Sequence, residues 1–535
     1  MTETCDYLVI GGGTAGCIMA ARLSENPANR VILLEAGPED TDPWIHIPAG
    51  YAKLFASGKY DWKFQTEKEP ELGNRVVNWP RGKVLGGSGS INGLVFLRGS
   101  PHDYDRWAQA GARGWSYQDV LPAFRAIEDW QGPPNPARGT GGPVPVSEVR
   151  GMAPGAAAFV DACVAAGFPR HTDINADSIE GVAPMQLNVR RGRRISTAQA
   201  YLKPARKRSN LRVFTKTLVS RILIEDGRAT GCLARRDGAM TETFTARREV
   251  ILCAGAIVSP QLLMLSGVGA GDELKRHGLP VRVDRPAVGQ NLQDHLIARF
   301  MFRTKPAGTM NERAANLLRQ AIMAVGYAFH RSGPLAVGAT EASLFAKVTP
   351  GAEEAEVQYQ FVNFSLKPNA GYTLADHPGF MFNFGQCRPD SRGELRLRSA
   401  DPTTKPSIRA NYLSALTDQH VMLEGARLGR RIADTPPFRD LILGDVWPGD
   451  APPQTDEEML DYIRATGTTV YHPCGTCRMG SDDQAVVDTN LRVRGVDGLR
   501  VVDASVFPLI PSTNIQPAVM MVAERAAGMV KQEGR

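Results

Sequence analysis

A glycine-rich turn near the N-terminus constrains the possible folds of this chain more than any other feature. Gly11, Gly13 and Gly16 follow the GxGxxG spacing, after a segment at 6–10 that predicts a buried strand and before a stretch at 14–23 that predicts a helix. Residues 30–34 predict a second strand, which leads to Glu35, where a carboxylate can accept hydrogen bonds from ribose hydroxyls. Because the turn lacks side chains, its backbone can touch a pyrophosphate at the start of the helix. The sequence therefore predicts a Rossmann-like βαβ unit that binds a dinucleotide, and it leaves FAD and NAD open at this point.

Two further segments rich in small residues favour FAD. Residues 81–93 (RGKVLGGSGSING) and 255–269 (GAIVSPQLLMLSGVG) together closely resemble the two signatures of the glucose-methanol-choline (GMC) oxidoreductases, which bind FAD. The resemblance continues in family order through 288–292 and 411–413, and it is thinnest between 304 and 386, where family members differ in substrate. Within the family, the chain resembles bacterial choline-dehydrogenase-like FAD alcohol dehydrogenases.

The hydrophobic patterns and the resemblance imply an α/β protein (α+β overall), with a Rossmann-like FAD-binding domain and a separate antiparallel-sheet substrate domain. We expect the FAD-binding domain to be discontinuous and to contain residues 1–155, 196–296 and 470–535, with a lid-like loop near 40–80. Residues 156–195 and 297–469 form the expected substrate-binding domain. Predicted strands at 356–361 and 394–397 and a predicted helix at 418–432 belong to the substrate domain, whereas a strand at 499–503 and a helix at 517–530 return to the first domain.

The family pattern, carried over position by position, implies which residues hold FAD. A reduced flavin carries negative charge, and the helix expected to open at Pro517 directs its positive dipole end toward it. Some family members attach FAD covalently through a histidine just before Asn92; here that position is Ile91, which offers no nucleophile, so we expect non-covalent FAD. The implied contacts are Gly11, Gly13, Thr14, Ala15, Gly16, Glu35 and Ala36 for the ADP half, Val219 for adenine, Arg81, Val84, Gly86, Ser88, Asn92 and Gly93 for the flavin side, Asp503 and Ala504 for the ribityl and pyrophosphate, and Asn514, Gln516 and Pro517 along the isoalloxazine.

His472 is the candidate catalytic base. A hydride leaves an alcohol carbon readily only when the hydroxyl proton is also removed, and an imidazole titrates in the useful range. The resemblance identifies His472 with the family's catalytic histidine and Asn514 with its partner, which is histidine or asparagine in different members. Asparagine cannot act as a base, so Asn514 is expected to orient the substrate oxygen. The predicted reaction is the oxidation of a primary alcohol to an aldehyde by hydride transfer to flavin N5.

Several alternatives stay open from the sequence. A hydroxynitrile-type lyase, a choline-specific dehydrogenase and a flavin-free binding protein are conceivable on the same fold, and Glu341 is the local acidic candidate for a cationic substrate. His472, Cys474 and Cys477 supply only three local metal ligands, so no metal is expected, and the eight scattered cysteines predict reduced thiols. The candidates for an apolar substrate pocket are Tyr51, Trp62, Phe361 and Phe364.

Charge and hydropathy bound the expected partners and location. The formal net charge of +6 without a long run of like charge argues against nucleic acid and leaves a small-molecule alcohol as the expected partner. The expected electron acceptor is oxygen or a quinone or dye-like molecule, and Val470 matches an apolar position found in oxidases of the family. The apolar stretch 317–329 is too short to span a membrane and is expected to cover the second domain, with an amphipathic membrane contact as the alternative. We therefore expect a cytoplasmic protein, with peripheral membrane association left open, and the sequence does not determine the oligomeric state.

Overall fold

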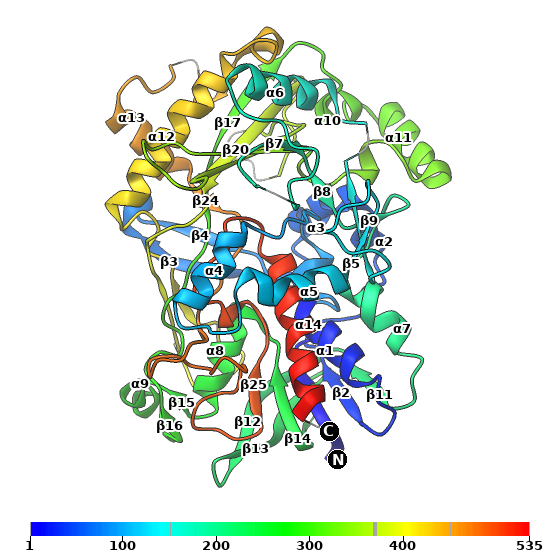
Figure 1. Cartoon of the computed structure of the whole chain (residues 1–535), viewed down its shortest axis with the longest axis vertical. Helices are drawn as coiled ribbons and strands as arrows, with labels where there is room; N and C mark the ends of the chain where they lie inside the picture. The colour runs from blue at the N-terminus through cyan, green and yellow to red at the C-terminus, as the bar shows by residue number, and fades with distance from the viewer. Residues whose placement is uncertain are drawn as a thin grey trace.

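Two large β-sheets, one in the lower half and one in the upper half of Figure 1, organise the chain. The computed structural model describes residues 2–149, 151–176, 178–238, 240–367, 372–449 and 451–533. Each sheet is assembled from segments that are far apart in the sequence, and both termini lie at the lower end in Figure 1.

The first sheet is mainly parallel and has the strand order β11-β2-β1-β14-β13-β12, with β25 beside β14. Strands β11, β2, β1, β14 and β25 run parallel, whereas β14, β13 and β12 form an antiparallel meander. Helices α1 and α14 pack against each other beside this sheet (Figure 1). The bounds are β1 (Thr2–Ile10), β2 (Val31–Leu34), β11 (Leu211–Phe214), β12 (Thr217–Glu225), β13 (Arg228–Arg236), β14 (Thr241–Leu252), β25 (Leu499–Val501), α1 (Thr14–Leu23) and α14 (Gln516–Glu533).

The N-terminal βαβ unit forms where the glycine pattern predicts it, so the Rossmann-like half of the fold is confirmed. Gly11 has a φ of +101°, a conformation that side chains disfavour. A Cβ on Gly16 would lie 1.8 Å from the carbonyl oxygen of Gly11, so only glycine lets α1 begin this close to the turn.

The second sheet is antiparallel throughout, as predicted, with the order β23-β17-β20-β19-β18-β7 and β24 beside β17. Side chains alternate along β17: Ala298, Phe300 and Phe302 are buried in the core, while Ile297 and Arg299 point to the opposite face. Helices α6 and α12 pack on the core face. The bounds are β7 (Gly181–Pro184), β17 (Leu296–Thr304), β18 (Ala342–Ala346), β19 (Val357–Val362), β20 (Gly379–Gln386), β23 (Ile442–Trp447), β24 (Thr468–Thr469), α6 (Pro154–Ala165), α12 (Leu416–Ala433) and α13 (Asp456–Thr466).

Two expectations about local structure need adjustment. The segment near 40–80 is more than a loop, because it contains helices α2 (Pro43–His46) and α3 (Tyr51–Ser57) and the hairpin of β3 (Phe64–Glu69) and β4 (Arg75–Trp79). The strand predicted at 394–397 forms as β21 (Glu394–Arg396), but it pairs only with β22 (Ser407–Arg409), outside the second large sheet.

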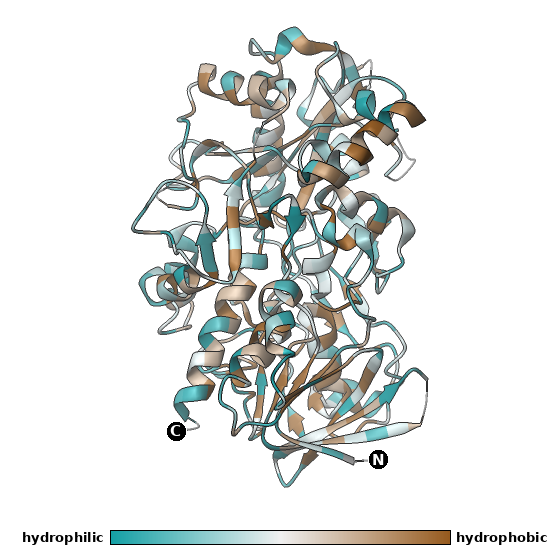
Figure 2. Cartoon of the chain, turned by 90° about the vertical axis from the view of Figure 1, so that its right-hand side faces the viewer, coloured by the Kyte–Doolittle hydropathy of each residue, from teal (hydrophilic) through white to brown (hydrophobic). Residues whose placement is uncertain are grey.

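Helix α11 (Leu317–His330) contradicts the expectation that it covers the second domain. Of its side chains only that of Tyr327 is buried, whereas Leu317 is 83% and Phe329 80% exposed. Figure 2, which views this side, shows several apolar residues along the ribbon of this helix. The physical reason is that α6 and α12 already cover the core face of the second sheet, so the apolar face of α11 has no partner. In the part of the chain that the structure describes, no helix combines the length and apolarity needed to cross a membrane.

Candidate active site

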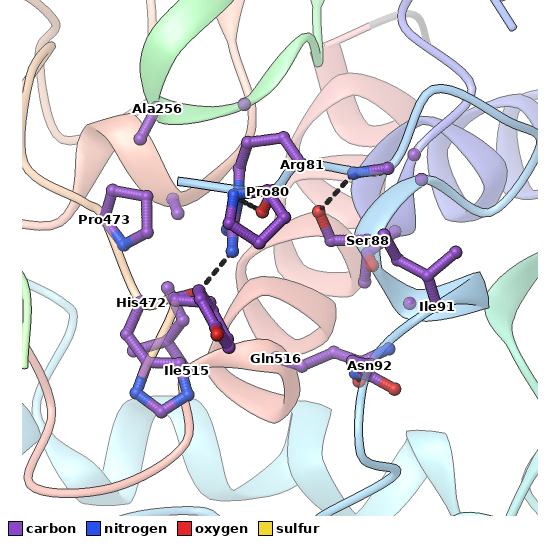
Figure 3. A pocket seen from close by; sticks show the side chains of 18 of the residues that line it. Pro80, Arg81, Ser88, Ile91, Asn92, Ala256, His472, Pro473, Ile515 and Gln516 are labelled. Atoms are coloured by element: carbon purple, nitrogen blue, oxygen red, sulfur yellow. Dashed lines mark hydrogen bonds between the residues drawn. The ribbon is translucent and has the colours of Figure 1, made fainter. Parts of the chain in front are cut away.

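A cavity of about 350 Å³ opens between the two sheets and collects most of the predicted site residues. Figure 3 shows His472 and Pro473 on one side of it, Ser88, Ile91 and Asn92 on the other. The predicted residues on its wall are Gly11, Gly13, Thr14, Ala15, Glu35, Ala36, Arg81, Ser88, Asn92, Gly93, Val219, His472, Asp503, Ala504, Asn514 and Gln516.

Four residues expected to contact FAD do not lie on the wall. Gly16 closes α1 onto the glycine turn, as described above. Gly86 has a φ of +84°, and a Cβ there would lie 2.2 Å from the Ser90 hydroxyl oxygen. Val84 packs in a small apolar cluster with Ile45 and Leu54, and Pro517 is buried in the first turn of α14. These residues shape the loops around the cavity.

At the nucleotide end, two glycine loops cross closely enough to form a cradle. A Cβ on Gly87 would lie 2.8 Å from the Cα of Gly13, so side chains there would fill the space. The Glu35 carboxylate accepts the backbone N–H groups of Gly12 (2.8 Å) and Gly37 (2.6 Å), and burial raises its pKa to about 7. Gln516 accepts a hydrogen bond from Asn92 and leaves its own buried Nε2 without a partner. The cradle and this unpaired donor fit a dinucleotide cofactor.

The loop that carries His472 is anchored by a buried carboxylate. Asp294 accepts the His472 backbone N–H (2.7 Å), the Thr469 hydroxyl (2.5 Å) and the Tyr412 hydroxyl. Its pKa is raised to about 6 by burial. Tyr471, just before the histidine, has a φ of +70°, and Arg81 donates to its carbonyl oxygen at 2.7 Å. These contacts hold the loop in a conformation that a non-glycine residue rarely adopts.

A second buried histidine fixes the tautomer of His472. His295 Nε2 lies 2.9 Å from the Cys387 carbonyl oxygen, which can only accept, so Nε2 carries the proton. Burial lowers the His295 pKa to about 4, so the ring is neutral and its Nδ1 is an acceptor. His472 Nδ1 lies 2.9 Å from that atom and must donate to it. The Nε2 of His472 is therefore unprotonated, and its lone pair faces away from His295.

Asn514 and Gln360 complete the arrangement around this lone pair. The Asn514 amide Nδ2 lies 3.1 Å from His472 Nε2, and its Oδ1 accepts from Gln360 Nε2 at 3.2 Å. Gln360 thus sets which way the Asn514 amide faces. The pKa of His472 lies well below its ordinary value because of burial, then the nearby His295 and Arg81, so the imidazole is neutral. The sequence analysis missed Asp294, His295 and Gln360, and only the adjacent Asp-His pair offered a signal.

Glu341 does not lie on the cavity wall. It accepts the backbone N–H of Ala153 at 2.7 Å, so a role in binding a cationic substrate is not supported by its position. Of the four aromatic candidates, Tyr51, Trp62 and Phe364 line the cavity, whereas Phe361 packs against Phe159 and Phe380 in the core.

The cysteines near His472 are buried thiols. All eight cysteines of the chain are free and buried, and burial raises the pKa values of Cys474 and Cys477 well above the ordinary range. No group of three or more histidine, cysteine or acidic side chains among the described residues is arranged to hold a metal ion.

Comparisons with known proteins agree with this geometry. Two family models described as GMC oxidoreductase match residues 5–297 and 389–523. The chain is 42% identical to proteins named oxygen-dependent choline dehydrogenase from Brucella anthropi, over 524 residues, and from Sinorhizobium fredii, over 525 residues; both alignments cover 98% of this chain and 94% of the relative. Among solved structures it resembles pyridoxine 4-oxidase from Mesorbium loti (TM-score 0.89, 32% identity, 99% of each chain) and formate oxidase of Aspergillus oryzae RIB40 (TM-score 0.93, 30% identity, 99% of this chain and 98% of the other).

The lowered pKa of His472 predicts an unusual pH profile. Because the neutral imidazole is favoured, the base form is fully present at pH 6.5 and above and is lost only as pH falls through the lowered pKa. Reduction of the bound flavin by saturating alcohol, followed anaerobically by stopped flow, should be independent of pH from about 6.5 upward. An acidic limb centred at or above that pH would contradict the assignment.

The pH profile of the His295→Ala variant, compared with that of the wild type, tests the role of His295. It removes the acceptor for the His472 Nδ1 proton and one cause of the lowered pKa. The plateau should fall about 10- to 100-fold, as is typical when the partner that orients a functional histidine is lost, and the acidic limb should move to higher pH. A purely structural role would lower the rate without moving the limb.

Proposed function

We propose, from the premise that this chain belongs to the GMC oxidoreductase family, that it oxidises a primary alcohol to an aldehyde with His472 as the base. Family membership makes the chain an FAD-dependent oxidoreductase that acts on CH–OH donors. The observation that carries the assignment of the base is the unprotonated Nε2 of His472, which accepts from the Asn514 amide, both residues lying on the cavity wall.

The residues divide the reaction between them. FAD, when bound, supplies the acceptor for the hydride that leaves the alcohol carbon. The alcohol oxygen lies beside the Asn514 amide, which donates to it and orients it, and His472 Nε2 takes the hydroxyl proton. His295 keeps the opposite nitrogen of the His472 ring protonated, so the ring accepts the new proton only at Nε2. The start of α14 at Gln516 adds a positive dipole end on the cavity wall.

Replacement of His472 by alanine tests the base directly. The variant should bind FAD and stay folded, because the glycine loops are untouched, while flavin reduction by alcohol slows by roughly 10²–10⁴-fold. Asn514→Ala removes one polar contact and should lose on the order of 1–3 kcal/mol of transition-state stabilisation. The measurement is anaerobic stopped-flow reduction.

The surface variant His102→Ala, whose side chain is 67% exposed, is the matched control and should be unaffected. A His472→Ala enzyme reduced at nearly the wild-type rate would reject the mechanism. If no alcohol bleaches the wild-type flavin, the lyase alternative gains support.

We propose that FAD is held without a covalent bond. Ile91 lies on the cavity wall just before Asn92, at the position where other family members carry the histidine that tethers the flavin. Acid precipitation of the holoprotein should therefore release the yellow chromophore into the supernatant. Colour that remains with the washed, denatured pellet would indicate a covalent link.

The proposed electron acceptor is oxygen or a quinone or dye-like molecule. The exposed helix α11 supports a further proposal, that the protein contacts the membrane surface. Its exposed apolar side chains include Ile322 (64%) and Val325 (56%), and residues 317–331 contain no acidic side chain. Arg319 lies on the helix, Arg331 follows its last residue, and Arg191 and Arg193 flank Gly192, which Tyr327 contacts; all four are exposed, and none forms an ion pair with a residue that the structure describes. The Tyr327 hydroxyl donates to the Gly192 carbonyl oxygen (2.8 Å), in the turn between β9 (Val189–Arg190) and β10 (Arg193–Arg194). Exposed apolar side chains beside arginines that form no ion pair match an anionic lipid surface.

Vesicle binding tests this contact. The protein should co-sediment with vesicles that contain phosphatidylglycerol and much less with phosphatidylcholine vesicles. Phe329→Glu should weaken binding at least about tenfold, because an exposed phenyl ring loses its burial in lipid. Leu416→Glu, at an apolar residue that is 79% exposed elsewhere, is the control. If the wild-type protein is a dimer that does not bind vesicles, and Phe329→Glu makes it a monomer, then α11 forms a contact between subunits instead.

A further inference from the structure

Arg299 stands on the cavity wall without a partner. It projects from β17 on the face opposite the core, and its side chain forms neither a hydrogen bond nor an ion pair with a described residue. Its Nε is buried and unpaired. A buried guanidinium donor without an acceptor is costly, and in an active site it points to a ligand group that is brought in from outside.

The strand register places Arg299 in line with Gln360, the residue that binds the Asn514 amide. Arg299 is directly opposite Asn383 on β20, and Asn383 is directly opposite Gln360 on β19. Gln360 in turn donates to Asn514. Neighbouring strands are about 4.8 Å apart, so the Arg299 backbone lies about 10 Å across the sheet from that of Gln360. The Asn383 Oδ1 between them is also buried and unpaired.

Apart from Arg299, the acidic and arginine side chains on the cavity wall already form hydrogen bonds within the protein. The wall carries two carboxylates: Glu35 is held by backbone N–H groups at the nucleotide end, and Asp503 accepts from Gly255 N–H (2.8 Å) and the Ser259 hydroxyl (2.5 Å). Arg81 donates to carbonyl oxygens of the His472 loop and of Pro80. Arg299 is therefore the one charged side chain of the cavity wall without a hydrogen-bond partner among the described residues.

The space between Arg299 and the base suits an apolar body. Val362, Phe364, Leu366 and Met381 line the same cavity, and so do Phe55, Tyr372 and Tyr471, whose rings pack together with Phe55–Tyr372 and Phe55–Tyr471 centroid distances of 5.4 and 5.3 Å. A ligand that fills this space presents its alcohol to His472 and its far end to Arg299.

We propose that the substrate is an alcohol that carries an anionic group, such as a carboxylate, at the end remote from the hydroxyl, and that Arg299 binds this group. The inference rests on the proposed function and names its substrate class. A guanidinium forms a paired hydrogen-bonded contact with a carboxylate, which an isosteric methyl group cannot make. The same charge repels a quaternary ammonium, so choline is a poor substrate for this chain despite the names of its relatives.

A matched set of alcohols tests the proposal in the holoenzyme. Anaerobic flavin reduction is measured with 4-(hydroxymethyl)benzoate, with 4-methylbenzyl alcohol of the same shape, and with choline. The carboxylate should show an efficiency about 10- to 100-fold above that of the neutral alcohol, and choline should be the poorest of the three. Benzoate binding, followed by the change that it causes in the flavin absorbance spectrum, gives a readout that needs no turnover.

Variants assign the effect to Arg299. Arg299→Gln should abolish the advantage of the carboxylate over 4-methylbenzyl alcohol and weaken benzoate binding by the same factor. Arg303→Gln, on the same strand but off the cavity wall, is the control. If the Arg299→Gln variant binds no FAD, the comparison of the three alcohols on the wild-type enzyme still tests the proposed substrate class.

The proposal is overturned if the neutral alcohol or choline is the better substrate, or if Arg299→Gln keeps the preference for the carboxylate. Failure of all three alcohols to reduce the flavin would instead reject the proposed alcohol oxidation.

Discussion

A buried chain of hydrogen bonds joins the two sheets through the catalytic histidine. Gln360 of the second sheet donates to Asn514, Asn514 to His472, His472 to His295, and His295 to the Cys387 carbonyl oxygen. Every link runs in one direction, because the carbonyl at the end can only accept. Reversing any ring or amide would set two donors or two acceptors against each other in a buried place, which is costly. The hydrogen-bonding needs of the neighbouring groups therefore fix the tautomer and the orientation of His472.

This arrangement depends on a backbone held under strain. Tyr471 occupies the left-handed region, and the energy that this conformation requires comes from Asp294 and Arg81, which bind the loop on both sides of it. Asp294 is the last residue before His295, so one short segment both anchors the loop of His472 and supplies the acceptor for its ring. Burial explains the electrostatics: a charged imidazole is disfavoured here, and a neutral one is the form that can accept a proton.

The two ends of the cavity differ in how their charges are used. At the nucleotide end, glycine loops and backbone N–H groups surround Glu35 and leave room for phosphates. At the other end, apolar and aromatic side chains separate the base from a single unpaired guanidinium. Gln360 and Arg299 project into the cavity from the second sheet, whereas the glycine loops and Glu35 belong to the first.

The sequence by itself determined the elements whose cause is local. Glycine at positions 11 and 16 is required by a turn and by a helix that starts against it, and the periodicity of 14–23 gives α1 its bounds, so these could be predicted without a fold. The family signatures also indicated His472 and Asn514. Only the tertiary structure decided what surrounds them. Gln360 and Arg299 reach the cavity through strand register, and a slip of one residue would turn either side chain into the core. The tautomer of His472 follows from a partner 177 residues away in the sequence. The exposure of α11 follows from which helices cover the sheet, since the same apolar periodicity serves a buried helix and an exposed one.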